Sequence, residues 1–285
     1  MFEGTGVALV TPFTKENEVD FPALSRIVDA VIDGGVDYLV ALGTTAETPT
    51  LTKKEKLAVL QHILQHNNKR VPVVVGIGDY NTQGLLDALQ EYPMDGVAGI
   101  LSVVPYYNKP SQEGIYQHFK TLAEATDKPI ILYNVPGRTV TNILPATVVR
   151  LAETYSNIVA IKEASGNLAQ CMELVARVPS GFSVLSGDDN LVLAQAAIGM
   201  KGVISVAANC YTVDFCAMVQ YALSGSMEAA RTLHYKLLPQ INLLFAEGNP
   251  AGVKYVLHRQ GLCENVLRLP LVPASPALQQ QFDQA

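Results

Sequence analysis

Lys162 is the residue of this chain whose type and position best suit covalent chemistry. It ends the apolar run Ile158-Val159-Ala160-Ile161, which is typical of a buried strand. Burial removes water from an ammonium group and so favours the neutral amine, which attacks carbonyl carbon and forms a Schiff base. For an isolated lysine, a side chain that extends from a strand end into solvent is the better interpretation. The polar residues that are expected to lie near Lys162 favour the chemical interpretation instead.

A phenol and a guanidinium follow the preceding apolar run. Tyr133 ends the run Ile130-Ile131-Leu132, and Arg138 follows the turn Pro136-Gly137. If the two runs are neighbouring strands, both groups lie beside the amine. The phenol could carry protons during carbinolamine formation, and the guanidinium could bind a carboxylate through two hydrogen bonds. A core tyrosine and a surface salt bridge are the alternatives, but the combination indicates chemistry on a keto acid.

Other polar groups also follow apolar runs. Gly43-Thr44-Thr45 offers hydroxyl and main-chain N–H groups that could hold a carboxylate, or it could be a simple capping turn. Tyr106-Tyr107 could form an aromatic patch at a subunit contact, with one hydroxyl in a proton relay, or could simply pack. Asp188-Asp189 is predicted to cap the helix that follows it rather than to bind Mg²⁺.

Eight short apolar segments alternate with amphipathic segments, and these must position the polar groups. The predicted strands span residues 6–13, 37–43, 72–78, 97–104, 129–135, 158–162, 182–187 and 202–207. The predicted helices span residues 22–33, 53–67, 82–91, 112–125, 145–153, 168–177, 190–198 and 213–223. This pattern predicts an α/β protein with a (β/α)₈ barrel, whose active site lies at the C-terminal strand ends. A doubly wound sheet competes, but no Gly-rich phosphate fingerprint follows the first strand.

The rest of the chain predicts helices without another strand. Helical patterns cover residues 227–247, 249–259 and 278–281. We therefore expect a barrel over residues 1–224 that carries the active site, and a C-terminal helical region over residues 225–285 packed on it.

Composition excludes several classes of function. The 285 residues are 49% hydrophobic and carry a net charge of −6, so the chain lacks the basic footprint of a nucleic-acid-binding protein. No apolar run reaches the roughly 18 residues of a membrane helix, and the N-terminus Met1-Phe2-Glu3-Gly4 lacks the basic segment and apolar core expected of a signal peptide. The four cysteines form no CxxC pair, which indicates neither disulfides nor zinc. These features place the protein in the cytoplasm.

Several motifs in order resemble the dihydrodipicolinate synthase family, among the class I pyruvate aldolases related to N-acetylneuraminate lyase. They are Gly43-Thr44-Thr45-x-Glu47, Pro105-Tyr106-Tyr107-Asn108, Tyr133-Asn134-Val135-Pro136-x-Arg138, Ile161-Lys162-Glu163-Ala164 and Gly202-Val203-Ile204-Ser205-Val206. The resemblance covers essentially the whole chain. It implies a TIM barrel, a homotetramer built as a dimer of dimers, and no cofactor.

The resemblance also implies a reaction and its residues. Lys162 would form a Schiff base with pyruvate, and the resulting enamine would attack L-aspartate 4-semialdehyde to give 4-hydroxytetrahydrodipicolinate, a precursor of diaminopimelate and lysine. Tyr133, Thr44 and Tyr107 would form a proton relay, Tyr107 coming from a neighbouring subunit. The implied substrate-binding residues are Thr45, Arg138, Gly187 and Ile204.

The alternative within the superfamily is an aldolase that acts on a 2-keto-3-deoxy sugar acid or N-acetylneuraminate. Such relatives resemble this chain at the lysine and the tyrosine but generally lack the arginine at position 138. A non-catalytic barrel and a phosphate-handling isomerase are further alternatives. The intact set of polar residues argues against the first, and acidic Asp188-Asp189 against the second.

Feedback inhibition by L-lysine is expected to be weak or absent. The positions that the resemblance aligns with the lysine site of sensitive relatives are Thr48, Pro49, Lys53, Lys56, Tyr80, Gly84 and Tyr106. The acidic residue expected near Gly84, which would hold the amino group of the effector, is missing, and Lys53 and Lys56 would repel a cation.

Overall fold

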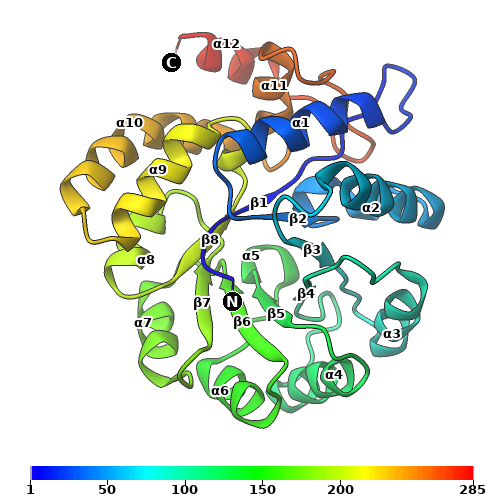
Figure 1. Ribbon diagram of the computed structural model, residues 1–285, viewed down its shortest axis with the longest axis vertical. Coiled ribbons are helices and arrows are strands. Elements are labelled where there is room, and N and C mark those ends of the chain that lie inside the picture. Colours follow the sequence, from blue (N-terminus) through cyan, green and yellow to red (C-terminus); the bar gives the residue numbers. More distant parts are fainter. Residues whose placement is uncertain (1, 285) are drawn as a thin grey trace.

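Eight parallel strands close into a barrel in which each strand pairs with the next along the chain and β8 pairs with β1 (Figure 1). The computed structural model describes residues 2–284. The strands are β1 (Gly4–Ala8), β2 (Tyr38–Ala41), β3 (Val73–Gly76), β4 (Gly99–Val103), β5 (Ile130–Asn134), β6 (Ile158–Glu163), β7 (Ser183–Ser186) and β8 (Gly202–Ser205). Because all eight run the same way, their C-terminal ends meet at one mouth of the barrel.

Helices surround the barrel and continue beyond it. The α-helices are α1 (Phe21–Asp33), α2 (Lys53–Asn67), α3 (Thr82–Glu91), α4 (Gln112–Glu124), α5 (Pro136–Thr139), α6 (Pro145–Thr154), α7 (Leu168–Arg177), α8 (Val192–Ala197), α9 (Thr212–Leu223), α10 (Met227–Phe245), α11 (Ala251–Arg259) and α12 (Pro276–Gln284). The 3₁₀-helices are η1 (Thr44–Ala46), η2 (Thr48–Thr50) and η3 (Ala207–Asn209). Side chains cap several N-termini: Asp20 accepts from Ala23 N, and Thr52 forms a reciprocal capping box with Glu55.

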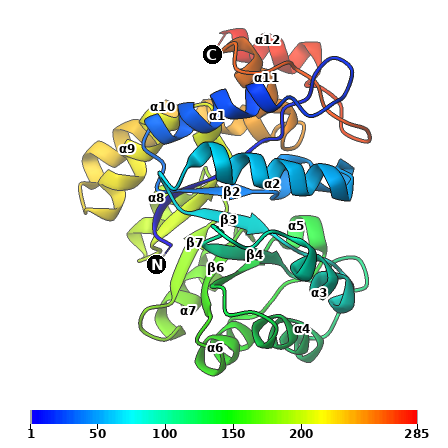
Figure 2. The same cartoon turned by 45° about the vertical axis from the view of Figure 1, so that its right-hand side comes forward.

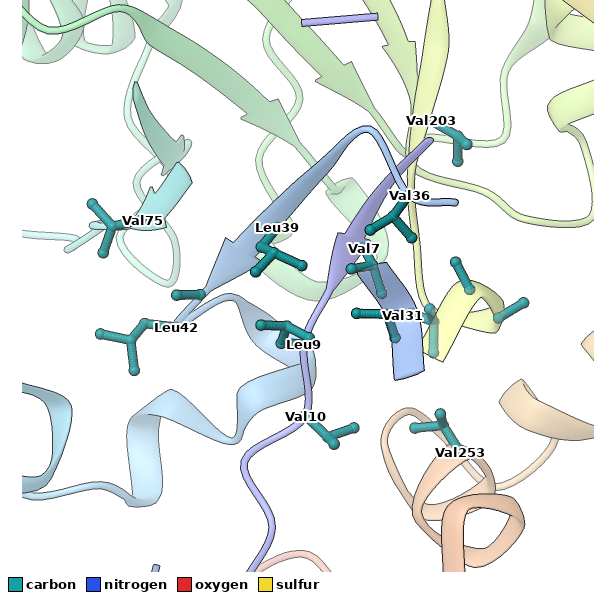
Figure 3. Packing of buried hydrophobic residues seen from close by; sticks show 14 of the residues in the cluster. Val7, Leu9, Val10, Val31, Val36, Leu39, Leu42, Val75, Val203 and Val253 are labelled. Carbon is teal, nitrogen blue, oxygen red and sulfur yellow. The ribbon is translucent and has the colours of Figure 1, made fainter. Parts of the chain in front are cut away.

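The apolar residues form two layers because side chains alternate across each strand. Outward-facing residues such as Val7 and Leu39 pack against the helices, and Figure 3 shows them beside Val31 of α1. Inward-facing residues such as Ala8 and Val40 fill the barrel interior. Strands covered on both faces are nearly continuous in apolar residues, as the sequence predicted.

One strand breaks the alternation. Ile130 of β5 pairs with Ile158 of β6, but Ile131 pairs with Ala160, so Val159 is an extra residue in β6. This bulge brings Tyr133 of β5 level with Lys162 of β6. A regular ladder would place Tyr133 opposite Ile161, one residue short of the lysine.

The barrel fold and the C-terminal helices are confirmed. The structure shortens the first predicted strand, begins the seventh predicted helix at Val192 (α8) instead of residue 190, and adds the short helices η1, η2, η3 and α5. Both views place α11 and α12 beside α1, with α10 beside α9 (Figures 1 and 2). Leu244 and Val253 of this region share the outer apolar layer of the barrel. The division at residues 224 and 225 stays a prediction. In the part of the chain described, every helix is too short or too polar to cross a membrane.

Candidate active site

Lys162 and Tyr133 lie side by side at the C-terminal mouth of the barrel. The Lys162 Nζ is 4.5 Å from the centre of the Tyr133 ring. Lys162 is 6% exposed and Tyr133 is 7% exposed, so the amine sits in a largely dry environment that still opens on a cavity. The sequence prediction that the phenol lies beside the amine is therefore confirmed.

A cavity of ≈ 420 Å³ lies above these two residues. Of the predicted site residues it brings together Thr44, Thr45, Tyr133, Arg138, Lys162 and Gly187. The other residues that line it are Ala8, Gly43, Leu101, Val135, Gly137, Ala164, Asp188, Val206, Phe245 and Asn249. Amine, phenol, hydroxyls and guanidinium therefore share one space large enough for two small acids.

Two predicted site residues do not line this cavity. Ile204 is fully buried inside the barrel, where its side chain packs with Leu185 and Ile131. Tyr107 is 87% exposed and has a φ of 72°, which is unusual for a tyrosine. Within this single chain, the Tyr107 hydroxyl belongs to no site.

Hydrogen bonds from distant parts of the chain hold the threonine turn in place. Asn249 Nδ2 donates to Thr45 Oγ1 at 2.9 Å, and Thr48 Oγ1 donates to Gly43 O at 2.9 Å. Arg138 Nη2 donates to Asn249 O at 3.4 Å, which links the guanidinium to the same point. Asn249 was not predicted as a site residue, because the Asn249-Pro250 pair in the sequence indicates only the start of a helix.

A buried ion pair also fixes the position of the residue that follows this turn. Glu47 follows the turn with a φ of 54°, and its carboxylate contacts the Lys254 ammonium, both side chains being fully buried. Glu47 also accepts from Arg268 N at 2.9 Å, and Lys254 Nζ donates to Val266 O at 2.9 Å. Burial lowers the pKa of Lys254, and the negative charge of Glu47 opposes that effect. The C-terminal region thus sets the position of the residues that follow β2.

A second buried carboxylate fixes the end of β6. Glu163, next to Lys162, is fully buried and accepts from Asn134 Nδ2 at 2.9 Å and Gln170 Nε2 at 3.0 Å. Its other oxygen accepts from Ser165 N at 2.8 Å. These donors compensate the loss of water, so the strand end that carries the reactive lysine is rigid.

The prediction that Asp188-Asp189 caps the next helix is wrong. Helix α8 begins only at Val192, and no side chain caps it. Asp189 instead accepts from Val206 N at 3.0 Å and Ala207 N at 2.8 Å, which ties the end of β7 to the end of β8. Asp188 lines the cavity.

Gly187 leaves the space that Lys162 needs. A Cβ at this position would lie 2.5 Å from Ala164 Cβ and 3.0 Å from Lys162 Cε. The glycine therefore permits the lysine side chain to extend into the cavity, and Gly187 lines that cavity with its main chain.

A second cavity of ≈ 390 Å³ adjoins the first. Thr44 and Tyr133 line both cavities. Asp79 lines it, and the Asp79 Oδ2 is 3.0 Å from where a Cβ on Gly84 would lie. The argument that this region lacks an acidic residue is therefore wrong. Weak inhibition by L-lysine stays a prediction, and it now rests on Lys56, because Lys53 pairs with Glu91 outside the cavity.

No group of three or more His, Cys, Asp or Glu among residues 2–284 is arranged to hold a metal ion. The cavity offers an amine, a phenol, hydroxyls and a guanidinium for chemistry. A lysine amine beside a tyrosine at the mouth of a (β/α)₈ barrel defines a Schiff-base-forming lyase of the aldolase type.

The chain belongs to the dihydrodipicolinate synthetase family, whose model matches residues 1–285. It is 51% identical to a 4-hydroxy-tetrahydrodipicolinate synthase of Flavobacterium psychrophilum, over 99% of this chain and 96% of that protein. The crystal structure of dihydrodipicolinate synthase from Aquifex aeolicus superimposes with a TM-score of 0.96 at 41% identity, over 99% of this chain and 96% of the other. A monomeric dihydrodipicolinate synthase variant superimposes with a TM-score of 0.97 at 40% identity, over 99% and 95%. The chain is a lyase of diaminopimelate and lysine biosynthesis.

Removing the Lys254 charge should destabilise the enzyme strongly. A Lys254→Met variant leaves the buried Glu47 carboxylate without its ion partner, so the free energy of unfolding should fall by about 3–5 kcal/mol. Urea unfolding followed by circular dichroism measures this. The control is Lys236→Met, which breaks an exposed pair with Asp214 and should cost less than about 1 kcal/mol. Equal losses in the two variants would contradict the anchoring role of the buried pair.

Proposed function

We propose that this enzyme binds pyruvate as a Schiff base on Lys162 and condenses it with L-aspartate 4-semialdehyde. The family provides the reaction, 4-hydroxy-tetrahydrodipicolinate synthesis. One observation carries the assignment of residues: the Lys162 amine lies against the Tyr133 ring in a cavity that also contains Thr44, Thr45 and Arg138.

The first half of the reaction activates pyruvate. Thr45 and the main-chain N–H groups of the turn hold the carboxylate, which places the ketone carbon near Nζ. The neutral amine adds to that carbon, and Tyr133 supplies the proton with which the carbinolamine hydroxyl leaves as water. Loss of a methyl proton from the iminium then gives the enamine. Thr44 lines the cavity with Tyr133, so its hydroxyl can pass protons to and from the phenol.

The second half forms the carbon–carbon bond. The enamine carbon attacks the aldehyde carbon of L-aspartate 4-semialdehyde, and the oxygen that becomes negative takes a proton from the relay. Arg138 lines the same cavity, and its guanidinium binds the carboxylate of this substrate. Gly187 and Ile204 contact the bound molecules through their main chains, since Gly187 has no side chain and the Ile204 side chain points into the barrel.

The relay requires a second subunit. Tyr107 is exposed on its own chain and has a φ of 72°, and the exposed ring supports insertion into a neighbouring site. We propose a homotetramer built as a dimer of dimers, working in the cytoplasm without nucleic acid or membrane partners. The exposed Tyr80, which packs edge-on against Tyr106 with ring centres 5.4 Å apart, belongs to the same contact surface.

The Schiff base is tested by borohydride reduction in the presence of pyruvate, followed by intact-mass and peptide mass spectrometry. We expect one pyruvyl adduct per chain, located at Lys162, and none in a Lys162→Ala variant, whose kcat should fall by about 10³-fold or more. A Lys69→Ala variant, which changes an exposed lysine, should behave as the wild type. An adduct at another lysine would overturn the assignment.

Arg138 should determine how well the second substrate binds. An Arg138→Ala variant loses a charge-assisted pair of hydrogen bonds, so kcat/KM for the semialdehyde should fall by about 10- to 100-fold or more. Formation of the pyruvyl adduct should not change. The control is Arg177→Ala, which breaks an exposed pair with Glu173. Full activity of Arg138→Ala would favour a sugar-acid substrate instead.

A further inference from the structure

One charged side chain that lines the active-site cavity, Asp188, has no role in the proposed reaction. Lys162 and Arg138 are the cationic side chains of this cavity, and Asp188 is its carboxylate. The second substrate carries an aldehyde, a carboxylate and an ammonium group. Lys162 chemistry accounts for the aldehyde and Arg138 for the carboxylate, while the ammonium still lacks a partner.

Asp188 is held so that one carboxylate oxygen stays free. Its Oδ2 accepts from Gly166 N at 3.1 Å, and its own N–H donates to Ser186 Oγ at 3.1 Å. Ser186 Oγ in turn donates to Asp188 O at 3.2 Å. Among the described residues no donor reaches Oδ1. The residue caps no helix, since α8 starts further along the chain, so the structural role that the sequence suggested for it is absent.

The surroundings of Asp188 suit proton transfer near neutral pH. Burial raises the pKa of Asp188 to about 6. The Gly166 N–H and the positive charge of Lys162 oppose this rise, while the negative charges of Glu163 and Asp189 add to it. A carboxylate with such a pKa is charged at pH 7 and can still accept a proton from a bound ammonium group more readily than an exposed aspartate can.

We propose that Asp188 binds the ammonium group of the second substrate and removes its proton before ring closure. This inference rests on the proposed function, because it uses the adduct on Lys162. It adds a residue that touches substrate, and it assigns the recognition of an amino acid aldehyde to two side chains of opposite charge, Arg138 and Asp188.

Ring closure moves the bond of the adduct carbon from Nζ to the substrate nitrogen. After the carbon–carbon bond has formed, the adduct is an iminium on Nζ and carries the free ammonium. Asp188 Oδ1 takes one proton, and the nitrogen lone pair forms a bond to the iminium carbon. The new ring nitrogen passes a second proton to Nζ. The bond between that carbon and Nζ then breaks, its electron pair returns to Nζ as neutral Lys162, and the ring leaves as a protonated cyclic imine.

The test compares two aldehydes that differ only in the amino group. L-Aspartate 4-semialdehyde and succinate semialdehyde are each added to enzyme preloaded with pyruvate, and borohydride reduction with intact-mass spectrometry follows the species on Lys162 over time. With wild-type enzyme, the first aldehyde should discharge the lysine, whereas the second should leave an open-chain adduct, because it cannot close a ring.

An Asp188→Asn variant should separate the steps. We expect the pyruvyl adduct to form as in the wild type and succinate semialdehyde to condense at the wild-type rate. Discharge with L-aspartate 4-semialdehyde should slow by about 10- to 100-fold, so that its open-chain adduct accumulates. The wild-type discharge rate should fall as the pH drops through about 6, because protonated Asp188 cannot accept a proton, and the variant should lose this dependence. Asp127→Asn, which changes an exposed aspartate before β5, is the matched control.

Three results would overturn the proposal. The variant could discharge the lysine at the wild-type rate with unchanged pH dependence. The variant could react more slowly with both aldehydes to the same extent, which would indicate that Asp188 affects only the shape of the cavity. It could fail to form the pyruvyl adduct while circular dichroism shows native folding, which would place Asp188 in the first half of the reaction. If the wild type itself forms no pyruvyl adduct, the proposed function fails first, and the role of Asp188 falls with it.

Discussion

The closure of a parallel barrel is the constraint on which this active site depends. Closing the sheet leaves no free strand edge and brings the C-terminal ends of all eight strands to one mouth, so residues from Thr44 to Asp188 meet in a single cavity. The bulge at Val159 completes that geometry, because it turns a ladder that would present Ile161 to Tyr133 into one that presents Lys162. Side chains alternate across a strand, so a slip of one residue would have pointed the amine at the helices. One extra residue in β6 thus decides on which face the reactive group lies.

Buried carboxylates connect this framework to the reacting groups. A buried ion pair contributes little net stability, because desolvation offsets the attraction, but it is sensitive to the position of both partners. Glu47 and Lys254 therefore define where the threonine turn sits, and Glu163 with its three donors defines where β6 ends. The two sides of the cavity are each held by a carboxylate outside it. The cavity itself contains a carboxylate, Asp188, with one oxygen that no donor from residues 2–284 reaches.

Strand order and the residues at strand ends could be predicted from the sequence, because periodicity is local and the barrel converts local order into spatial proximity. Lys162 and Tyr133 were found in this way. Contacts made by residues far apart along the chain left no such signal. Asn249 bonds to Thr45 across 204 residues, and Lys254 reaches Glu47 from a helix that the sequence placed only on the outside of the barrel. The prediction that Asp188-Asp189 caps a helix was wrong because the loop after β7 is longer than the pattern indicated. Both side chains therefore contact residues outside that helix.

The contacts that reach back from the C-terminal region have a consequence for how the enzyme is made. Every strand of the barrel has been synthesised by residue 205, so the amine of Lys162 has its scaffold while the ribosome still has Asn249, Lys254 and Arg268 to add. Until those residues arrive, the turn after β2 lacks the partners of Thr45 and Glu47. We therefore expect a nascent chain to capture keto acids less readily than the finished polypeptide does. Activity would then be a property of the finished polypeptide, although Tyr133 and Lys162 are synthesised well before Asn249.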